Sequence, residues 1–516
     1  MVKSFDIVIV GLGPTGAVLA NMLGQLGWSV LGIEREEDLY YAPRAVHFDD
    51  EIMRIFQSIG LENEILSTSE AFHKMEFMLK PEGKPIASGL VGSQDLRYGF
   101  PGAFWFHQPT LEKHLHEGLK RFPNVEIIYG NEVIDIKQNV QTVEIFLQGI
   151  NDSIQCKYVI GCDGGRSSVR KIANLALESA DFDQAWVVVD TKTKDGLKEP
   201  DLPNSHRQYC NPSQPVTYVP IAGPYYEWQF MIVDNRSEKE AVDPAYVRQL
   251  LKNYVDLNKV EITRIAYYKF HGLWATKWRN KRIIIAGDAA HQMPPFLGQG
   301  MCSGIRDASS LAWRLDLVLK NMTDESIIDT YETERYTHVK HIINGAILLG
   351  GIIQTTNKWK ALLRNMFLFK PLAYSNVFRT WFTQKANRKK PLEKGLIGNN
   401  ISQLAGHLCI QPKVSIGRNE ILLDNLLGNK FAIIQKLDDQ IFIHQLGLTE
   451  LSNFKIEQLS TEKPIMCKSL LNWIEQHHVD FILIRPDKYI FDAGRMEELP
   501  KVIDNLFNMI PYHKMN

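Results

Sequence analysis

Residues 5–16 read Phe-Asp-Ile-Val-Ile-Val-Gly-Leu-Gly-Pro-Thr-Gly, and this stretch decides the fold. An apolar run from Phe5 to Val10 ends in a glycine-rich turn, and apolar residues at helical spacing follow from Ala17 to Leu26. A second apolar run, Val30 to Ile33, comes next. The order strand, tight turn, helix, strand predicts one βαβ unit with a right-handed crossover.

The three glycines of the turn have the spacing of a dinucleotide-binding motif. Gly11 permits the tight turn, Gly13 lets the backbone approach a diphosphate, and Gly16 lets the helix pack closely on the strand. Glu34 lies 18 residues beyond Gly16, at the end of the second strand, where an acid can bind a ribose hydroxyl. The alternative is a chance glycine-rich turn, but the strand, helix and acid in register favour dinucleotide binding. The motif alone does not distinguish FAD from NAD.

Composition argues against several classes of function. The 516 residues include 58 basic and 59 acidic side chains, so no global charge favours nucleic acid. The six cysteines form no C-x-x-C pair and no zinc-ligand spacing with histidine, so we expect neither a metal site nor a disulfide framework. The first apolar run is too short for a secretory signal, and Ile342 to Ile353 is too short to span a membrane. We therefore expect a cytoplasmic protein with no integral membrane segment, in which 342–353 is a buried helix.

Two later segments place an aspartate at the end of a predicted strand. Asp163 follows the apolar run that begins at Tyr158, and Asp288 follows the run Arg282 to Ala286. Open α/β sheets bind ligands at the carboxyl ends of their parallel strands, where an aspartate can accept a hydrogen bond from a ribose or ribityl hydroxyl. A long helix is predicted after Gly300, and its N-terminus suits a ring that carries negative charge. Taken singly, each of these aspartates is better explained by a simple turn.

Taken together and in this order, the three segments resemble the FAD-dependent aromatic hydroxylases. These are single-component flavoprotein monooxygenases, typified by p-hydroxybenzoate hydroxylase and phenol hydroxylase, and the resemblance covers about residues 1–390. Within that group the chain looks most like the 3-(3-hydroxyphenyl)propionate hydroxylases. That similarity is carried by Pro43 to Glu51, Phe56 to Leu61, Arg121 to Glu126, Asp163 to Ser168 and Gly298 to Ala308.

The resemblance implies a set of cofactor-binding residues. Gly11, Gly13 and Gly16 would cradle the FAD diphosphate, and Glu34 would bind the adenosine ribose. The other residues implied to contact FAD are Arg35, Arg44, Gln108, Asp163, Asp288, Pro295, Gly298, Gly300 and Met301. Cys302 departs from the family, since many members of the wider superfamily have an asparagine at this position near the flavin.

The resemblance also implies an activity. NADH or NADPH would reduce FAD, O2 would add at the flavin C4a to give a hydroperoxide, and a small phenolic substrate would attack its distal oxygen. His47 is our candidate catalytic residue, because histidine titrates near neutrality and its loop is expected to approach the flavin. A histidine that merely packs in the loop is the alternative. Tyr218, Trp228 and Gln229 are candidates for the substrate cavity, with core packing as the alternative for each.

The predicted architecture is α/β, with a Rossmann-like FAD-binding domain interrupted by a mainly β substrate domain. FAD-binding segments are expected at 1–75, 101–180 and 273–390, and substrate-domain strands at 76–100 and 181–272. A basic, polar connection near 383–396 marks a boundary. Residues 391–516 resemble the thioredoxin-like domain of the phenol hydroxylase branch, without redox cysteines, and a homodimer is one hypothesis for its role.

Three other functions stay open at this point. One is a related flavoprotein oxygenase that acts on a polyketide or by Baeyer–Villiger insertion. Another is a flavin reductase or halogenase, although the chain has neither a redox cysteine pair nor the Trp-x-Trp-x-x-Ile signature of the halogenases. The last is a dinucleotide-binding scaffold without catalysis.

Overall fold

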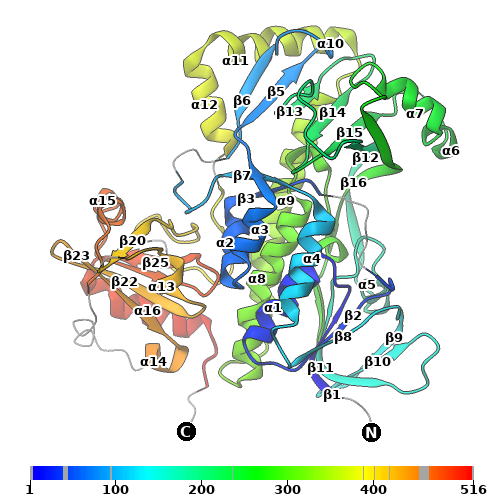
Figure 1. The fold of residues 1–516 in the computed structure, drawn as a ribbon. Coiled ribbons are helices and arrows are strands. Elements are labelled where there is room, and N and C mark those ends of the chain that lie inside the picture. The colour runs from blue at the N-terminus through cyan, green and yellow to red at the C-terminus, as the bar shows by residue number, and fades with distance from the viewer. Residues whose placement is uncertain are drawn as a thin grey trace.

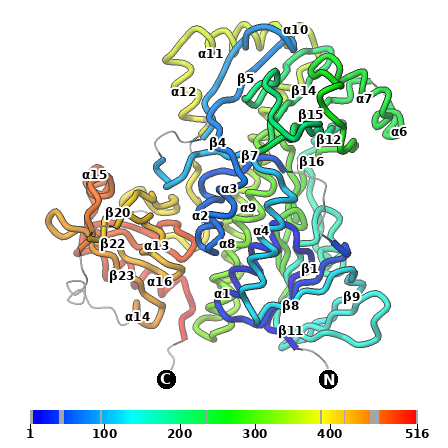
Figure 2. Tube along the Cα trace, in the orientation of Figure 1, coloured from blue at the N-terminus to red at the C-terminus, as the bar shows by residue number. Residues whose placement is uncertain are grey.

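The computed structural model describes residues 4–38, 45–92, 96–234, 236–387, 389–399, 401–417, 419–452 and 464–513. Figure 1 shows a mixed α/β molecule in three parts. One sheet carries the N-terminal strand, a second sheet lies at the opposite end of two long helices, and a C-terminal unit lies beside these helices. Figure 2 shows in the same orientation how the chain passes repeatedly between the first two parts.

The first sheet is built around β1 (Ser4–Val10), which pairs in parallel with β2 (Val30–Ile33) and with β11 (Ile154–Gly161). The strand order is β17-β18-β11-β1-β2-β8, with β10 and β9 added beside β11. The side chains of β1 from Ile7 to Ile9 are fully buried, as the apolar run predicted. The other strands are β8 (Val125–Ile128), β9 (Val133–Gln138), β10 (Val143–Leu147), β17 (Arg279–Asn280) and β18 (Ile283–Ile285).

Three helices pack together over this sheet. α1 (Pro14–Gln25) follows the glycine turn and contacts both α4 (Gln108–Leu119) and α8 (Gly300–Leu319). A proline is at the first position of α1, where its missing N–H costs nothing. The buried Asn21 amide donates to the carbonyls of Ala17 and Leu115, which ties α1 to α4. The strand–helix–strand unit predicted from the glycine motif is therefore present.

The second sheet has the order β19-β16-β12-β15-β14-β13-β5-β6. Its long strands β12 (Leu177–Thr193) and β16 (Val260–Ala275) are paired along most of their length. One face of the sheet packs on α7 (Pro244–Leu251), and the other packs on the helices between residues 327 and 374. The other strands are β5 (Lys74–Met78), β6 (Ala87–Leu90), β13 (His206–Tyr209), β14 (Val216–Pro220), β15 (Tyr225–Met231) and β19 (His291–Gln292).

α9 (Ile327–Ile353) corrects one expectation. Its last turns were predicted to be buried throughout, but Leu348 is 71% exposed while Ile343 and Ile353 are buried. The reason is that this end packs on the second sheet with only one of its faces. Beyond it the chain forms α10 (Lys358–Arg364), a π-helical turn (Asn365–Phe369), α11 (Lys370–Tyr374) and α12 (Asn376–Asn387). Among the described residues, no helix is long and apolar enough to cross a membrane.

A small sheet joins the first two parts. β3 (His47–Asp49) and β4 (Ser69–Ala71) pair with β7 (Ala103–Phe106). β3 runs directly into α2 (Asp50–Ser58), whose N-cap is Asp49. The remaining short helices before residue 390 are α3 (Glu62–Ser67), α5 (Ser168–Ile172) and α6 (Glu238–Ala241).

The C-terminal unit contains a four-stranded sheet of order β23-β22-β24-β25. Every pairing in it is antiparallel, and β22 (Phe431–Leu437) turns directly into β23 (Gln440–Leu446). The thioredoxin-like assignment and the domain limits stay predictions. The other elements are β20 (Lys413–Ile416), β21 (Asn419–Leu422), β24 (Phe481–Ile484), β25 (Ile490–Gly494), α13 (Asp424–Leu427), α14 (Leu448–Ser452), α15 (Lys468–Gln476) and α16 (Leu499–Met509).

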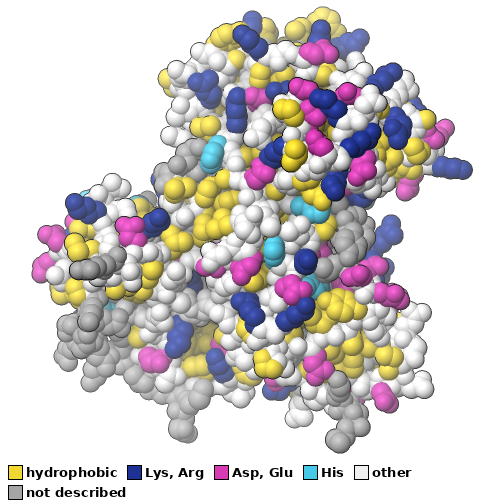
Figure 3. Space-filling model, in the orientation of Figure 1, with side chains coloured by type: hydrophobic (Ala, Val, Ile, Leu, Met, Phe, Trp, Pro, Cys, Tyr) yellow, Lys and Arg dark blue, Asp and Glu magenta, His cyan; other side chains and the backbone are white. Residues whose placement is uncertain are grey.

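The surface agrees with the balanced composition. Figure 3 shows acidic and basic side chains interspersed over the face in view. Such mixing gives no extended field of one sign to attract a polyanion. In the described part of the chain, no group of three or more histidine, cysteine or acidic side chains is arranged to bind a metal ion.

Candidate functional site

Two glycines of the turn are required for packing, whereas the third faces open space. Gly11 has φ +90°, and a Cβ there would lie 2.6 Å from the carbonyl oxygen of Cys162. A Cβ on Gly16 would lie 2.0 Å from the carbonyl oxygen of Gly11. A Cβ on Gly13 would meet no atom within 4 Å. Gly11 and Gly16 therefore allow the strand, turn and helix to pack, whereas Gly13 leaves its surroundings accessible to a ligand.

A pocket opens beside this turn at the carboxyl ends of β1, β2 and β11. It encloses about 1030 Å³, part of which is open solvent, and Gly13, Glu34 and Asp163 all line it. The Glu34 carboxylate accepts a hydrogen bond from the Leu12 backbone N–H at 2.8 Å. This bond ties the end of the second strand to the glycine turn. The pocket brings the glycine turn and Asp163 together, whereas the third predicted segment, with Asp288 and Gly300, does not line it.

Asp163 has one carboxylate oxygen engaged and one available. Its Oδ2 accepts hydrogen bonds from the backbone N–H groups of Ser168 at 2.7 Å and Val169 at 3.0 Å. Its Oδ1 is buried and has no hydrogen-bond partner among the described residues. Burial raises the pKa of this carboxyl. A buried acceptor without a partner is costly, so a ligand hydroxyl that donates to it would be stabilised.

Sequence reasoning missed two of the residues that line this pocket. Gln108 was predicted, but Glu112 and His116 lie one and two turns further along the same face of α4. The Gln108 amide donates to Glu112 at 2.6 Å and its oxygen accepts the Ala45 backbone N–H at 2.7 Å. His116 Nε2 lies 2.8 Å from the carbonyl oxygen of Leu12. The i, i+4, i+8 spacing from Gln108 was the signal that could have identified both residues.

The start of α8 forms a second part of the site. Pro295 begins a single 3-10 turn, and Gly298 ends it with φ +61°. A Cβ on Gly298 would lie 2.7 Å from Nδ1 of His47, so the chain comes close to the histidine here. The first N–H groups of α8, from Gly300 and Met301 onward, have no partner within the helix, as at any helix N-terminus.

The buried Cys302 thiol contacts backbone on both sides of this turn. Its Sγ lies 3.6 Å from the Gly298 carbonyl oxygen and 3.8 Å from that of His47. Cys302 therefore joins β3 to the start of α8.

The structure places the other three predicted cofactor residues differently from one another. Asp288 is exposed in the short turn after β18 and does not line the pocket. Arg35 lines the pocket, but its guanidinium pairs with Glu36 at the surface. Arg44 lies outside the described residues. Their contacts with FAD stay predictions.

His47 lies on β3 between the start of α8 and the second sheet. Its Nδ1 is 3.4 Å from the Gly298 carbonyl oxygen, and its Nε2 is buried without a partner in the described part of the chain. Burial lowers the pKa of this imidazole. The ring meets Phe72 edge-on, with 5.5 Å between centroids. A neutral His47 therefore has Nε2 free to accept a proton.

The comparisons with known proteins agree with this geometry. Residues 4–346 match the model of the family described as "FAD binding domain". A protein of Rhodococcus jostii named as a probable NADH-specific resorcinol 4-hydroxylase is 33% identical over 96% of this chain and 92% of its own. A 3-(3-hydroxy-phenyl)propionate/3-hydroxycinnamic acid hydroxylase of Mycolicibacterium gilvum is 31% identical over 97% of this chain and 91% of its own. The chain belongs to the FAD-dependent aromatic hydroxylases. The resemblance predicted from the sequence is confirmed.

Solved structures show the same fold over almost the whole hydroxylase. The flavin-dependent monooxygenase PieE, in complex with FAD and substrate, superposes with a TM-score of 0.78 at 18% identity and covers 98% of this chain and 99% of its own. Aklavinone-11 hydroxylase, with FAD and aklavinone, gives 0.77 at 18% identity over 98% of this chain and 99% of its own. Both alignments extend into the C-terminal unit.

The residues of the hydroxylase fit FAD. Gly13 leaves open space where a diphosphate would approach, and Asp163 Oδ1 offers a buried acceptor without a partner. Glu34 and Gln108 line the same pocket. FAD is therefore the cofactor and NAD(P)H the co-substrate, as predicted, while the individual contacts stay predictions.

Proposed function

We propose that this hydroxylase acts on a small, uncharged phenol of the resorcinol type. The observation that carries the proposal is a strip of polar side chains across the face of the second sheet that looks toward His47. Val219 of this face belongs to an apolar cluster with Phe72 and Trp105, and Phe72 contacts His47. The strip and the candidate catalytic histidine therefore border the same region.

One end of the strip consists of neutral hydrogen-bonding groups. The Thr217 hydroxyl donates to Gln208 Oε1 at 2.7 Å, and the Gln208 amide lies 2.8 Å from His206 Nε2. Gln229 lies opposite Thr217 in the register of β14 and β15. Burial lowers the pKa of His206 to about 3, with a smaller contribution from His47. These groups suit the hydroxyls of a neutral substrate, because each can donate or accept without a change of charge.

The other end of the strip contains two carboxyl groups. Asp190 and Glu227 face each other across β12 and β15, and burial raises the pKa of both carboxyl groups. Gln229 donates to Glu227 at 2.6 Å, and Arg264 donates to Asp190 at 2.5 Å. Burial, followed by the charge of Asp190, raises the pKa of Glu227 to about 8. We therefore assign the proton to Glu227 and the negative charge to Asp190.

This arrangement disfavours a substrate carboxylate. The Arg264 side chain on this strip is 14% exposed, and its charge is balanced by Asp190. Its Nη2 is buried without a partner among the described residues, so it can donate to a neutral hydroxyl oxygen of a substrate. An added carboxylate would meet the negative end of that pair without a counter-ion of its own, and an unpaired buried charge is expensive. The R. jostii relative is named for a substrate without a carboxylate, whereas the M. gilvum relative is named for phenylpropanoid acids. The polar strip favours the first of these substrate classes.

The proposed mechanism divides the work between cofactor and protein. When bound, FAD supplies electron transfer from NAD(P)H and the activation of O2. His47 accepts the phenolic proton at Nε2, because the contact of Nδ1 with Gly298 leaves the lone pair of Nε2 available. Gln208, Thr217 and Gln229 orient the substrate hydroxyls. The apolar side chains around Phe72 limit the access of water.

A comparison of substrates tests the proposal. Resorcinol and 3-(3-hydroxyphenyl)propionate are supplied in turn with NADH or NADPH, and the product mass is measured under labelled oxygen. We expect resorcinol to gain one oxygen atom, with a kcat/KM at least about tenfold above that of the acid, which corresponds to about 1.4 kcal/mol. A preference for the acid, or resorcinol that gains no oxygen atom, would contradict the proposal.

The carboxyl pair also predicts a dependence of stability on pH. Glu227 keeps its proton in the folded protein up to a pKa of about 8, whereas an ordinary glutamate loses it near 4.5. Between these values the folded state binds more protons than the unfolded state, so stability decreases as pH rises, by up to about 1.4 kcal/mol per pH unit. Glu227→Gln removes this contribution, and its thermal unfolding midpoint should fall less than that of the wild type between pH 5.5 and 8.5.

Glu261→Gln is the matched control for this measurement, since Glu261 is exposed on β16 of the same sheet. Its pH profile should run parallel to that of the wild type. A Glu227→Gln profile parallel to both would show that Glu227 is ionised throughout.

A further inference from the structure

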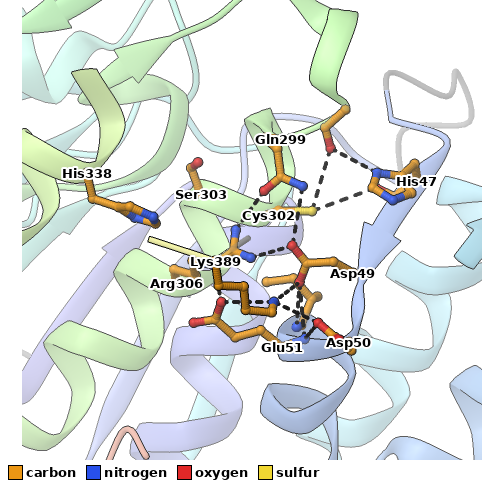
Figure 4. Close-up of polar contacts among 12 residues, drawn as sticks. His47, Asp49, Asp50, Glu51, Gln299, Cys302, Ser303, Arg306, His338 and Lys389 are labelled. Atoms are coloured by element: carbon orange, nitrogen blue, oxygen red, sulfur yellow. Dashed lines mark hydrogen bonds and ion pairs between the residues drawn. The ribbon is translucent and has the colours of Figure 1, made fainter. Parts of the chain in front are cut away.

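A row of three acids begins α2 and contacts two buried cations. Asp49 caps the helix by accepting the N–H groups of Glu51 and Ile52. Arg306 of α8 pairs with both Asp49 and Glu51, and its Nε lies 2.8 Å from Glu51 Oε2. Lys389, from the connection to the C-terminal unit, lies 2.7 Å from Asp50. Figure 4 shows these side chains pointing toward one another.

Arg306 and Lys389 keep Asp49 and Glu51 ionised despite their burial, whereas burial raises the pKa of Asp50. Burial opposes ionisation of Glu51, but Arg306 and Lys389 outweigh it and lower the pKa of Glu51 to about 2. The side chains of Glu51 and Arg306 are only 7% and 6% exposed. Removing one partner of a buried ion pair costs free energy, so a substitution in this cluster should shift the side chains that contact it.

One side of the cluster is bound by the C-terminal unit. The Tyr489 hydroxyl donates to Glu51 Oε1 at 2.8 Å, on the opposite oxygen from Arg306. One turn further along α2, Arg54 donates to both oxygens of Asp424, each at 2.8 Å. The C-terminal unit therefore contacts the same helix at several hydrogen-bonded points, which also include Gln57 with Asn425 at 2.6 Å.

The other side of the cluster reaches the start of α8. Arg306 Nη1 donates to Gln299 Oε1 at 2.9 Å, and the Gln299 amide lies 3.3 Å from Asp49 Oδ2. Gln299 is the N-cap residue of α8 and follows Gly298, which contacts His47. Figure 4 shows Gln299 between Arg306 and the turn that approaches His47.

We propose that Tyr489 is a positioning residue for the flavin-facing start of α8, acting through Glu51 and Arg306 on Gln299. The C-terminal unit then contributes to the active site without touching substrate or cofactor. Without its hydroxyl, Glu51 loses the partner that fixes its orientation. The pocket lined by Glu51 and Tyr489 gives the carboxylate room to turn, and Lys389 lies 3.5 Å from its other oxygen. Arg306 and Gln299 would then lose a fixed geometry.

The test uses the full-length holoenzyme with Tyr489→Phe. Two readouts concern the cofactor environment directly, the visible absorbance of bound flavin and the dissociation constant of FAD. A third, the hydrogen peroxide released per NAD(P)H oxidised in the presence of a phenol, rests on the proposed function. We expect an altered absorbance spectrum and a three- to tenfold rise in both the dissociation constant and peroxide release. This is about the size of an effect that one residue has on a site through intervening side chains. If no phenol is hydroxylated, the proposed function fails while the first two readouts still test Tyr489.

Two further variants separate positioning from general destabilisation. Tyr512→Phe removes a hydroxyl that donates to Thr449 within the C-terminal unit, and it should leave all three readouts unchanged. Glu51→Gln should change them in the same direction as Tyr489→Phe, and the double variant should show no more than the larger single effect, because the two residues act in one chain. Additive effects, or a Tyr489→Phe variant with wild-type spectrum and FAD affinity, would overturn the proposal.

Discussion

Replacing Gly13 by alanine is expected to give a protein that folds like the wild type but binds FAD about a hundredfold more weakly. The backbone at Gly13 has φ −61°, which alanine adopts without strain, and its Cβ would meet no atom of the chain within 4 Å. The same methyl group would occupy the side of the turn where the diphosphate must approach. Inserting a methyl into a well-fitted contact costs about 1–3 kcal/mol, which sets the size of the effect. FAD titration by fluorescence and thermal unfolding of the apoprotein measure the two quantities.

Two other glycines serve as controls for this prediction. Gly351→Ala, at an exposed position of α9 with open space around it, should leave FAD binding unchanged and raise stability by up to about 1 kcal/mol, because alanine favours a helix more than glycine does. Gly16→Ala should lower both together, since its Cβ would lie 2.0 Å from the Gly11 carbonyl oxygen. A Gly13→Ala protein that keeps one FAD per chain would show that the diphosphate does not pass this turn.

Local sequence patterns were enough to predict the nucleotide-binding half of the site. The apolar run and the three glycines determine β1, its turn and the start of α1, because burial and backbone conformation there depend on neighbouring residues. Asp163 could be placed at the same edge because the end of a parallel strand is itself a sequence signal. The glycine turn and Asp163 therefore line one pocket, whereas the third predicted segment does not.

The substrate-facing strip could not be predicted, because it depends on how strands pair. Trp228 and Gln229 are adjacent and must point to opposite faces of β15. The sequence does not say which face meets the flavin. In the structure Trp228 and Tyr218 pack in the core beside α7, so the packing interpretation is the correct one for both, while Gln229 bonds Glu227 on the other face. The Asp190–Glu227 pair arises only from the register of β12 against β15.

The contacts of the C-terminal unit could be predicted even less well from the sequence. Tyr489 and Glu51 are 438 positions apart, and no sequence motif links the two residues. The basic connection near 383–396 was predicted as an exposed linker, yet Lys389 inserts its ammonium among the buried acids of α2. A charge in a polar segment predicts solvent exposure only when no cluster of opposite charge lies within reach.

Replacing His47 by asparagine is expected to lower kcat/KM for phenol hydroxylation at pH 7 by at least about a hundredfold, the lower end of the range for losing a positioned base. Asparagine retains polarity and approximate size but cannot accept a proton. Since burial lowers the pKa of His47, the imidazole stays neutral at and somewhat below its ordinary pKa of 6.5. The wild-type rate should therefore be level from pH 8 to 6.5 and should fall only when more acidic solution protonates Nε2.

The asparagine variant should instead gain activity as pH rises, because ionisation of the phenol itself, with a pKa of about 10 as in tyrosine, then replaces the missing base. FAD content should remain at the wild-type level, which separates loss of proton transfer from loss of the cofactor. His114→Asn, on α4 beside Thr68, is the matched control and should keep the wild-type profile. A loss of less than threefold with an unchanged pH profile would assign His47 to packing against Phe72 and Gly298, and the phenolic proton would then have to leave by another route.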